Sequence, residues 1–302
     1  MRFWIMPELP EVETIARGLA KRVTGDVIVS VWLGQKKEPL KSPAAQIAKA
    51  LVGSRISSVR RMGKHIVFDL EPAPEAQKLS RPKSKSRRRT SSQDANAADA
   101  SHAASHVQWI VHLGMTGSLR VCEPQTEIAK HTHAILKLSS GCELRFVDPR
   151  RFGRLSVATA FDAAGVEPLE VDLARFVSLF RGRKTPIKSA LLNQKLLRGV
   201  GNIYADEALF RARIRPRRRA SSITRDQLVN LYAGLQQVLK EAIELGGSSI
   251  SDYVDADGEE GFFQLRHRVY GREGEPCLVC KTPIKRVVIA GRSSHYCPRC
   301  QK

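Results

Sequence analysis

Four cysteines near the C-terminus have spacing that suits a metal site. Cys277-x-x-Cys280 and Cys297-x-x-Cys300 are separated by sixteen residues. Each pair can chelate one edge of a tetrahedron, and four thiolates complete the shell of a structural Zn²⁺ with no open position. Two disulfides are the alternative, which a reducing cytoplasm disfavours. We therefore predict one zinc ion, bound by Cys277, Cys280, Cys297 and Cys300, that folds its module rather than catalyses.

A proline directly follows an internal methionine in Met6-Pro7-Glu8. If translation begins at Met6 and Met6 is removed, Pro7 has a free secondary amine, and an α-amino group titrates at about 7.7–8. Such an amine can attack a sugar C1′ and form an iminium intermediate, while Glu8 and Glu11 can move protons. From these residues alone, the commoner explanation is that Pro7 and Pro10 shape the entry to a helix.

Two further segments could contact phosphate. Gly199-Val200-Gly201-Asn202 lies between two helical patterns, where glycines allow close backbone approach and a helix N-terminus offers free N–H groups. Asn202 can cap that helix. Lys285, Arg286 and Arg292 lie between the cysteine pairs and predict a basic hairpin tip. Plain solvated turns are the alternative for both segments.

The charge balance favours a polyanionic partner. The 302 residues include 50 Lys and Arg against 30 Asp and Glu, a formal net charge of +20. Phosphate contacts dominate nucleic-acid affinity, so we expect nucleic acid rather than general solubility to explain the excess. No apolar run reaches the roughly 18 residues of a membrane span, and the first residues are too short for a signal peptide. The expected location is the cytoplasm.

Hydrophobic patterns indicate a β-rich first half. A helix is expected after Pro10, with its apolar face formed by Val12, Ile15, Ala16, Leu19 and Val23. Strands are expected at 66–70, 107–111, 134–138 and 143–147. Residues 73–106 have no aromatic residue and few aliphatic ones, which predicts a disordered basic insert between two strands.

After about residue 170 the pattern becomes helical. Thr185-Pro186 is typical of a helix start, and Gly199 can end that helix. Thr224 and Gln227 have capping-box spacing before a long apolar stripe from Leu228 to Ala242, which Gly246-Gly247 closes. We expect this stripe to be core. Cys122 and Cys142 are interpreted as packed thiols.

Several motifs, in order along nearly the whole chain, resemble the bacterial formamidopyrimidine-DNA glycosylase (MutM/Fpg) family. They are Pro7-Glu8-Leu9-Pro10-Glu11-Val12-Glu13-Thr14, His112-Leu113-Gly114-Met115-Thr116-Gly117-Ser118-Leu119, Asp148-Pro149-Arg150-Arg151-Phe152-Gly153, the Gly199–Tyr204 segment, Tyr270-Gly271-Arg272 and the four cysteines. The resemblance implies a bifunctional glycosylase and abasic-site lyase of base excision repair. Such enzymes remove oxidised purines (8-oxoguanine, formamidopyrimidines) from duplex DNA and cut the strand by β,δ-elimination.

The resemblance also implies residue roles. Pro7 would be the nucleophile, Glu8 the acid/base at the deoxyribose ring oxygen, and Lys64 a catalytic lysine that contacts phosphate. Asn202 and Arg292 would hold the phosphates that flank the flipped nucleotide, and His131 and Lys184 would bind DNA, Lys184 in handling the damaged base. Met115, Arg150 and Phe152 would fill the space left in the stack, with Arg150 also pairing with the orphaned cytosine.

The implied fold is α+β: an N-terminal two-sheet β-sandwich with a flanking helix, then a helical helix–two-turn–helix domain and a zinc finger. The expected divisions are a catalytic domain at 7–158 with its insert at 73–106, a hinge at 159–170, a DNA-binding domain at 171–265 and the finger at 266–302. We expect a monomer that binds damaged duplex DNA at the bacterial nucleoid, with the loop 247–263 over the flipped base.

Two features depart from the family pattern. Residues 1–6 would turn the nitrogen of Pro7 into an amide, so we expect translation to start at Met6. The second departure is the insert. The alternatives are an endonuclease VIII-type glycosylase for oxidised pyrimidines, against which Leu9 and the Met115/Arg150/Phe152 set argue, and a non-catalytic damage sensor, against which Pro7 and Glu8 argue.

Overall fold

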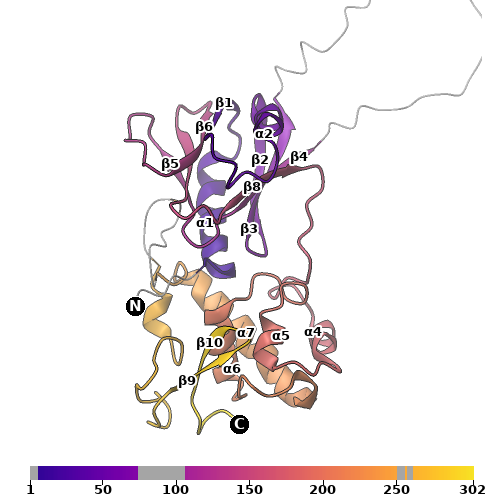
Figure 1. Cartoon of the computed structure of the whole chain (residues 1–302). Coiled ribbons are helices and arrows are strands. Elements are labelled where there is room, and N and C mark those ends of the chain that lie inside the picture. The colour runs from indigo at the N-terminus through magenta and orange to yellow at the C-terminus, as the bar shows by residue number, and fades with distance from the viewer. Residues whose placement is uncertain (1–5, 74–105, 250–255, 257–260) are drawn as a thin grey trace, which may run out of the picture.

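The computed structural model describes residues 6–73, 106–249, 256 and 261–302 (Figure 1). Almost all of the predicted insert, residues 74–105, lies outside the described residues. So do residues 1–5 and most of the loop that is expected to cover a flipped base. The predictions for these three segments therefore stay predictions.

The N-terminal part contains two four-stranded antiparallel sheets, as the sequence predicted. One sheet has the order β1-β6-β7-β5 and the other β2-β3-β4-β8. Their strands are β1 (Ile28–Leu33), β2 (Ser54–Met62), β3 (His65–Pro72), β4 (Val107–His112), β5 (Ser118–Cys122), β6 (Thr132–Leu138), β7 (Glu143–Val147) and β8 (Arg154–Ala158). The strands on either side of the insert, β3 and β4, pair directly, with Phe68 opposite Trp109.

Helix α1 (Leu9–Val23) contributes one face to the core of this part. All five residues of its predicted apolar face are buried and join a cluster with residues of both sheets. The short helix α2 (Ala44–Leu51) adds Ile47 and Leu51 to the same cluster. Because α1 is packed so firmly, the residues just before it, Pro7 and Glu8, have a fixed position.

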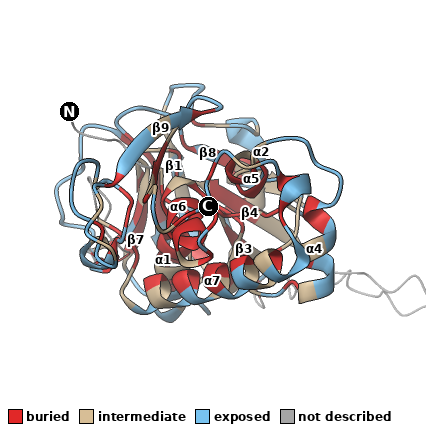
Figure 2. Cartoon of the chain, turned by 90° about the horizontal axis from the view of Figure 1, so that it is seen from below, coloured by how far each residue is buried: buried red, intermediate tan, exposed pale blue. Residues whose placement is uncertain are grey.

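The C-terminal part is helical around its own core. It contains α4 (Leu173–Phe180), α5 (Ile187–Leu191), α6 (Asn202–Arg211), the 3-10 turns η1 (Ala220–Ser222) and η2 (Phe263–Arg266), and α7 (Arg225–Glu244). Thr224 and Gln227 form the predicted capping box of α7, and its apolar stripe is buried against α6 (Figure 2).

One helix is shorter than predicted. α5 ends at Leu191, not at Gly199. The Asn193 side chain accepts a hydrogen bond from the Lys195 backbone N–H at 3.0 Å, and this local turn competes with helix continuation. Gln194 then binds Gly199 and Val200 through its side chain. The segment before α6 is thus a shaped loop.

The chain ends in a hairpin of β9 (Lys285–Ile289) and β10 (Arg292–Tyr296), which pair antiparallel. Phe210 of α6 and Val269 pack against Cys277 and Cys297 at its base. This arrangement completes the predicted α+β architecture. No helix within the described ranges is both long and apolar enough to cross a lipid bilayer.

Candidate active site and DNA-binding surface

A cleft of about 930 Å³ lies where the two parts of the chain meet. Residues from the start of α1, the β2–β3 turn, the loop before α6 and the finger hairpin line it. Those with polar side chains include Glu8, Lys64, His65, His112, Asn202, Tyr270 and Arg292. The structure therefore gathers four of the sequence-predicted residues, Glu8, Lys64, Asn202 and Arg292, in one place.

Glu8 is held at the junction of α1 and α6. Its backbone N–H donates to Oε2 of Glu11 at 2.9 Å, and its Oε1 accepts from the backbone N–H of Ile203 at 3.2 Å. The Leu9 N–H donates to the Gly199 carbonyl at 3.0 Å, which ties α1 to the loop before α6. The other carboxylate oxygen, Oε2, is buried and has no hydrogen-bond partner among the described residues.

Burial sets the protonation of this site. Desolvation raises the pKa of Glu8 to about 7, although the nearby Lys64 ammonium opposes the shift. Burial also lowers the pKa of Lys64, and the negative charges of Glu8 and Glu11 oppose that change. A carboxyl group with a pKa close to neutrality can both donate and accept a proton, which suits a general acid/base.

We predict that Gly201→Ala disables Glu8 without unfolding the protein. A Cβ at position 201 would lie 2.0 Å from Cδ of Glu8, so the carboxyl group would have to move. Misplacing a catalytic group by about 1 Å can cost about 10²-fold in rate. The base excision that the resemblance implies, measured in a single turnover, should fall by about that factor, while duplex affinity stays within about threefold. An unchanged excision rate would contradict the placement of Glu8. Gly34→Ala is the control, because a Cβ at Gly34 would meet only ordinary contacts of 3.6 Å or more and Gly34 lies outside the cleft.

We also predict a pH-dependent stability that Glu8→Gln removes. The pKa of Glu8 is about 7 in the folded chain against an ordinary value of 4.5, so the folded state binds the extra proton between these values. The free energy of unfolding should therefore decrease as pH rises through this window, by about 3 kcal/mol for this group. Urea unfolding of both proteins at about pH 5 and pH 8.5 measures the difference. Equal pH dependence in the two would contradict the assigned pKa.

Glu11, which the sequence offers as a second proton-transfer group, is buried and held by three hydrogen bonds. Its carboxylate accepts hydrogen bonds from the Glu8 N–H, the Ser248 N–H at 2.8 Å and the Tyr204 hydroxyl. Glu11 is 2% exposed and does not line the cleft. It therefore joins α1, α6 and the segment after α7 behind the active site.

Asn202 does not cap α6 as predicted. Gly201 is the N-cap residue, and Asn202 is the first residue of the helix. Gly201 occupies the cap position because only a residue without a side chain fits beside the Glu8 carboxyl group. The Asn202 side chain instead donates to Oγ of Ser293 at 3.2 Å, and its Oδ1 is buried with no partner among the described residues.

A buried charged network joins α5, α6 and the finger. The Lys188 ammonium forms an ion pair with Asp206 at 2.7 Å and donates to the Ser293 carbonyl at 2.6 Å. Asp206 also accepts from the His295 backbone N–H at 2.8 Å. The contacts with Ser293 and His295 reach β10 next to Arg292, so the network fixes the exposed Arg292 at the edge of the cleft.

A second cluster lies on two adjoining loops of the N-terminal part. Asp148 accepts from the Thr116 hydroxyl at 2.6 Å and the Gly153 N–H at 2.7 Å, and its own N–H donates to the His131 carbonyl. These contacts bring together the predicted DNA-facing residues of this part, which are Met115, His131, Arg150 and Phe152. The Arg150 guanidinium lies 4.8 Å from the ring centre of Phe152, which is 50% exposed.

The sequence analysis assigned no role to three residues that line the cleft, and one predicted DNA-binding residue, Lys184, does not line it. His65, His112 and Tyr270 line the cleft, and the only signal for them was their position inside or beside the quoted motifs. Lys184 is exposed and is not among the residues that line the cleft. Lys195 lines the cleft, and Lys188, next to the lining residue Ser189, is fully buried in the charged network.

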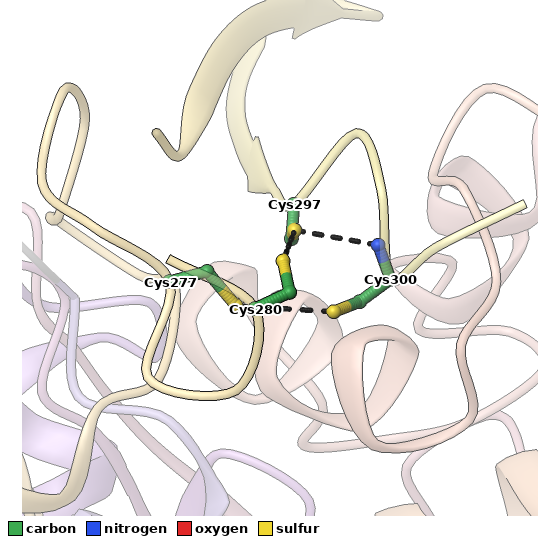
Figure 3. Close-up of side chains that lie close together, drawn as sticks. All are labelled: Cys277, Cys280, Cys297 and Cys300. Atoms are coloured by element: carbon green, nitrogen blue, oxygen red, sulfur yellow. Dashed lines mark hydrogen bonds between the residues drawn. The ribbon is translucent and has the colours of Figure 1, made fainter. Parts of the chain in front are cut away.

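The four cysteines converge as predicted (Figure 3). Their sulfur atoms all lie within 4.8 Å of one another. Cys277 and Cys300 are 3.9 Å apart and Cys280 and Cys297 3.4 Å apart, between sulfurs. Zn–S bonds of about 2.3 Å in a tetrahedron separate sulfurs by about 3.8 Å, so the site fits one structural zinc ion. Cys122 and Cys142 are free and partly buried.

Three family models match consecutive parts of the chain. Residues 6–155 match the formamidopyrimidine-DNA glycosylase N-terminal domain and residues 164–254 match the formamidopyrimidine-DNA glycosylase H2TH domain. Residues 274–302 match the zinc finger found in FPG and IleRS. These matches include Glu8, Lys64, Asn202, Arg292 and all four cysteines.

Full-length relatives and solved structures agree with these matches. The formamidopyrimidine-DNA glycosylase of Solibacter usitatus is 44% identical over 301 residues, covering 98% of this chain and 100% of that protein. The crystal structure of the MutM (Fpg) protein from Thermus thermophilus has a TM-score of 0.78 and 39% identity, covering 98% of both chains. Fpg of Lactococcus lactis, in complex with DNA that contains an abasic site, has a TM-score of 0.80 and 30% identity, covering 98% of this chain and 99% of that chain.

Proposed function

We infer the substrate class and the mechanism of the chain from its family, because it belongs to the formamidopyrimidine-DNA glycosylase family and is a DNA glycosylase of base excision repair. We propose that it removes oxidised purines from duplex DNA through a Schiff base at Pro7 and then cuts the strand by β,δ-elimination. The observation that carries this proposal is a pair of buried oxygens in the cleft wall, Oε2 of Glu8 and Oδ1 of Asn202, which have no hydrogen-bond partner among the described residues. Such atoms are costly unless a ligand satisfies them.

The first chemical step requires Pro7 to be the N-terminal residue. Its amine attacks C1′ of the damaged nucleotide, the glycosidic bond breaks, and the base leaves with the bonding electrons and takes up a proton. Glu8, with its pKa of about 7, protonates the ring oxygen as the C1′–O4′ bond opens and the iminium forms. The Lys64 ammonium neutralises phosphate at the same site.

Loss of the proton at C2′ then expels the 3′ phosphate, which is the β-elimination, and a second elimination expels the 5′ phosphate. Asn202 and Arg292 support this chemistry by holding the flanking phosphates, since both meet at β10 beside Glu8. Together these contacts keep the reacting sugar in place while these bonds break in sequence.

The cluster held by Asp148 supports base flipping. Extruding a nucleotide costs a few kcal/mol, which apolar wedges and a bidentate arginine offset. Met115 and Phe152 fill the vacated stack in this proposal, and Arg150 pairs with the orphaned cytosine. His131, whose carbonyl accepts a hydrogen bond from the Asp148 N–H, contacts the DNA backbone in this proposal. The substrate is double-stranded DNA with oxidised bases or abasic sites, and we place the enzyme in the cytoplasm at the nucleoid.

A panel of duplexes tests the substrate class. Single-turnover excision should be at least about 10²-fold faster on 8-oxoguanine or formamidopyrimidine opposite cytosine than on oxidised pyrimidines. Within this panel, Met115→Ala should slow excision of the damaged base more than strand cutting at a preformed abasic site. The reason is that excision of a base requires its full extrusion from the stack. Equal or greater activity on oxidised pyrimidines would favour the endonuclease VIII-type alternative, and binding without cutting would favour the damage sensor.

A further inference from the structure

A strongly basic surface lies away from the cleft, where three segments of the chain meet. The Ser221 N–H donates to the Arg183 carbonyl at 2.8 Å, and the Ala220 N–H donates to the Thr185 carbonyl at 2.9 Å. The Arg215 N–H donates to the Lys302 carbonyl, and the Lys302 N–H donates to the Arg213 carbonyl, both at 3.0 Å. We define the distal basic surface by its exposed cations: Arg183, Lys184, Arg213, Arg217, Arg219 and Lys302.

These cations are not engaged in ion pairs. None of the six takes part in a salt bridge within the part of the chain that the structure describes. The side chains of Arg213, Arg217 and Arg219 also make no hydrogen bond there. Unlike Arg61 or Arg211, which are bound to carboxylates, these arginines contribute little to the fold. Their positive charge is available to a partner.

The surface is separate from the active site. α6 begins at Asn202 in the cleft wall and runs for ten residues, so its far end lies about 15 Å away. Arg213 follows that far end, and none of the six cations lines the cleft. The C-terminal end of the chain, next to Arg213 and Arg215, lies at the centre of the face opposite the N-terminal sheets (Figures 1 and 2).

The chemistry of this surface favours DNA over a protein partner. Arginine forms bidentate contacts with phosphate, and a duplex offers one charge per about 1.7 Å, so an array of arginines needs no exact shape match. Protein interfaces instead depend on apolar or aromatic anchors. No large exposed apolar side chain in the described ranges comes from residues 181–185, 213–225 or 299–302. We propose that the distal basic surface binds a second duplex, without sequence preference, while the cleft holds the first.

Such a contact would let the enzyme transfer from one DNA segment to another while it always stays bound to at least one of them. Charge-driven binding of this kind is weak and rapidly reversible at physiological salt, so a second segment is sampled and exchanged. It also accounts for Lys184, which lies outside the cleft and contacts DNA in this proposal through phosphate only.

A two-duplex binding experiment tests the proposal. The cleft is first saturated with an unlabelled duplex that contains a stable abasic-site analogue, and a labelled undamaged duplex is then titrated in at about 0.1 M salt. We expect the second duplex to bind, with an affinity that falls steeply as salt rises. The triple variant Arg213→Ala, Arg217→Ala, Arg219→Ala should weaken this second binding by about 10²-fold and reduce the salt slope by about three.

The matched control is the triple variant Lys36→Ala, Lys37→Ala, Arg120→Ala. It makes the same change in net charge on exposed side chains of the N-terminal part. The control should bind the second duplex as the unaltered protein does. Both variants should retain single-turnover excision on 8-oxoguanine duplexes, which reports the cleft independently. Saturation at one duplex per protein, equal loss in both variants, or loss of excision in the arginine variant would each overturn the proposal.

Discussion

A chain that retains Met1 to Met6 should have almost no glycosylase or strand-cutting activity, although it binds damaged DNA. In that chain the nitrogen of Pro7 is an amide, whose lone pair is delocalised into the carbonyl group, so it cannot attack C1′. Loss of a catalytic nucleophile costs about 10³-fold or more in rate. Single-turnover excision by this chain and by one that starts at Pro7 measures the effect.

The two proteins are a matched pair, because they differ only in residues 1–6 and share every residue from Pro7 onward. Duplex affinity should differ little, since Lys64, Asn202 and Arg292 are present in each. Equal excision rates with residues 1–6 demonstrably retained would show that another group is the nucleophile. The assignment of Pro7 would then be wrong, whereas the geometry around Glu8 would still stand.

Replacing Cys297 with Ser should abolish tight DNA binding. Cys297 is fully buried, and its sulfur lies 3.4 Å from that of Cys280, so the zinc ion would lose one of four ligands. Structural zinc contributes roughly 10–16 kcal/mol to the fold of small modules. Without it, β9 and β10 would no longer hold Lys285, Arg286 and Arg292 in place, and duplex affinity should fall by about 10²-fold or more.

Cys122→Ser is the control, because Cys122 is a partly buried free thiol in β5, outside the metal site. Fluorescence anisotropy with an abasic-analogue duplex measures binding, and a zinc-specific indicator measures the metal content of each protein. A zinc-free Cys297→Ser protein with unaltered affinity would contradict the role of the finger. Removing zinc from the unaltered protein with a chelator should reproduce the loss.

The sequence predicted the parts of the fold that depend on regular patterns. The apolar face of α1, the strands on either side of the insert and the capping box of Thr224 all follow local periodicity or cap chemistry. The cysteine spacing was similarly decisive, because two pairs at this separation restrict the chemistry to metal binding or disulfides. Each of these features is encoded in a short stretch of the sequence.

The features that the sequence did not predict depend on contacts between distant residues. Gly201 rather than Asn202 caps α6 because the Glu8 carboxyl group, almost two hundred positions earlier, fills the space. α5 ends early because Asn193 and Gln194 bind the following loop. The Lys188–Asp206 ion pair depends on how α5 packs against α6. The raised pKa of Glu8 results from burial. None of these has a local pattern in the sequence.

Borohydride trapping, with the crosslinked peptide mapped by mass spectrometry, shows directly which group forms the iminium with the substrate. The enzyme is incubated with a duplex that carries 8-oxoguanine opposite cytosine, and the iminium is reduced to a stable amine. We expect a single adduct on the nitrogen of an N-terminal Pro7, absent when residues 1–6 are retained. An adduct on Lys64 or another lysine, or efficient excision with no adduct at all, would contradict it.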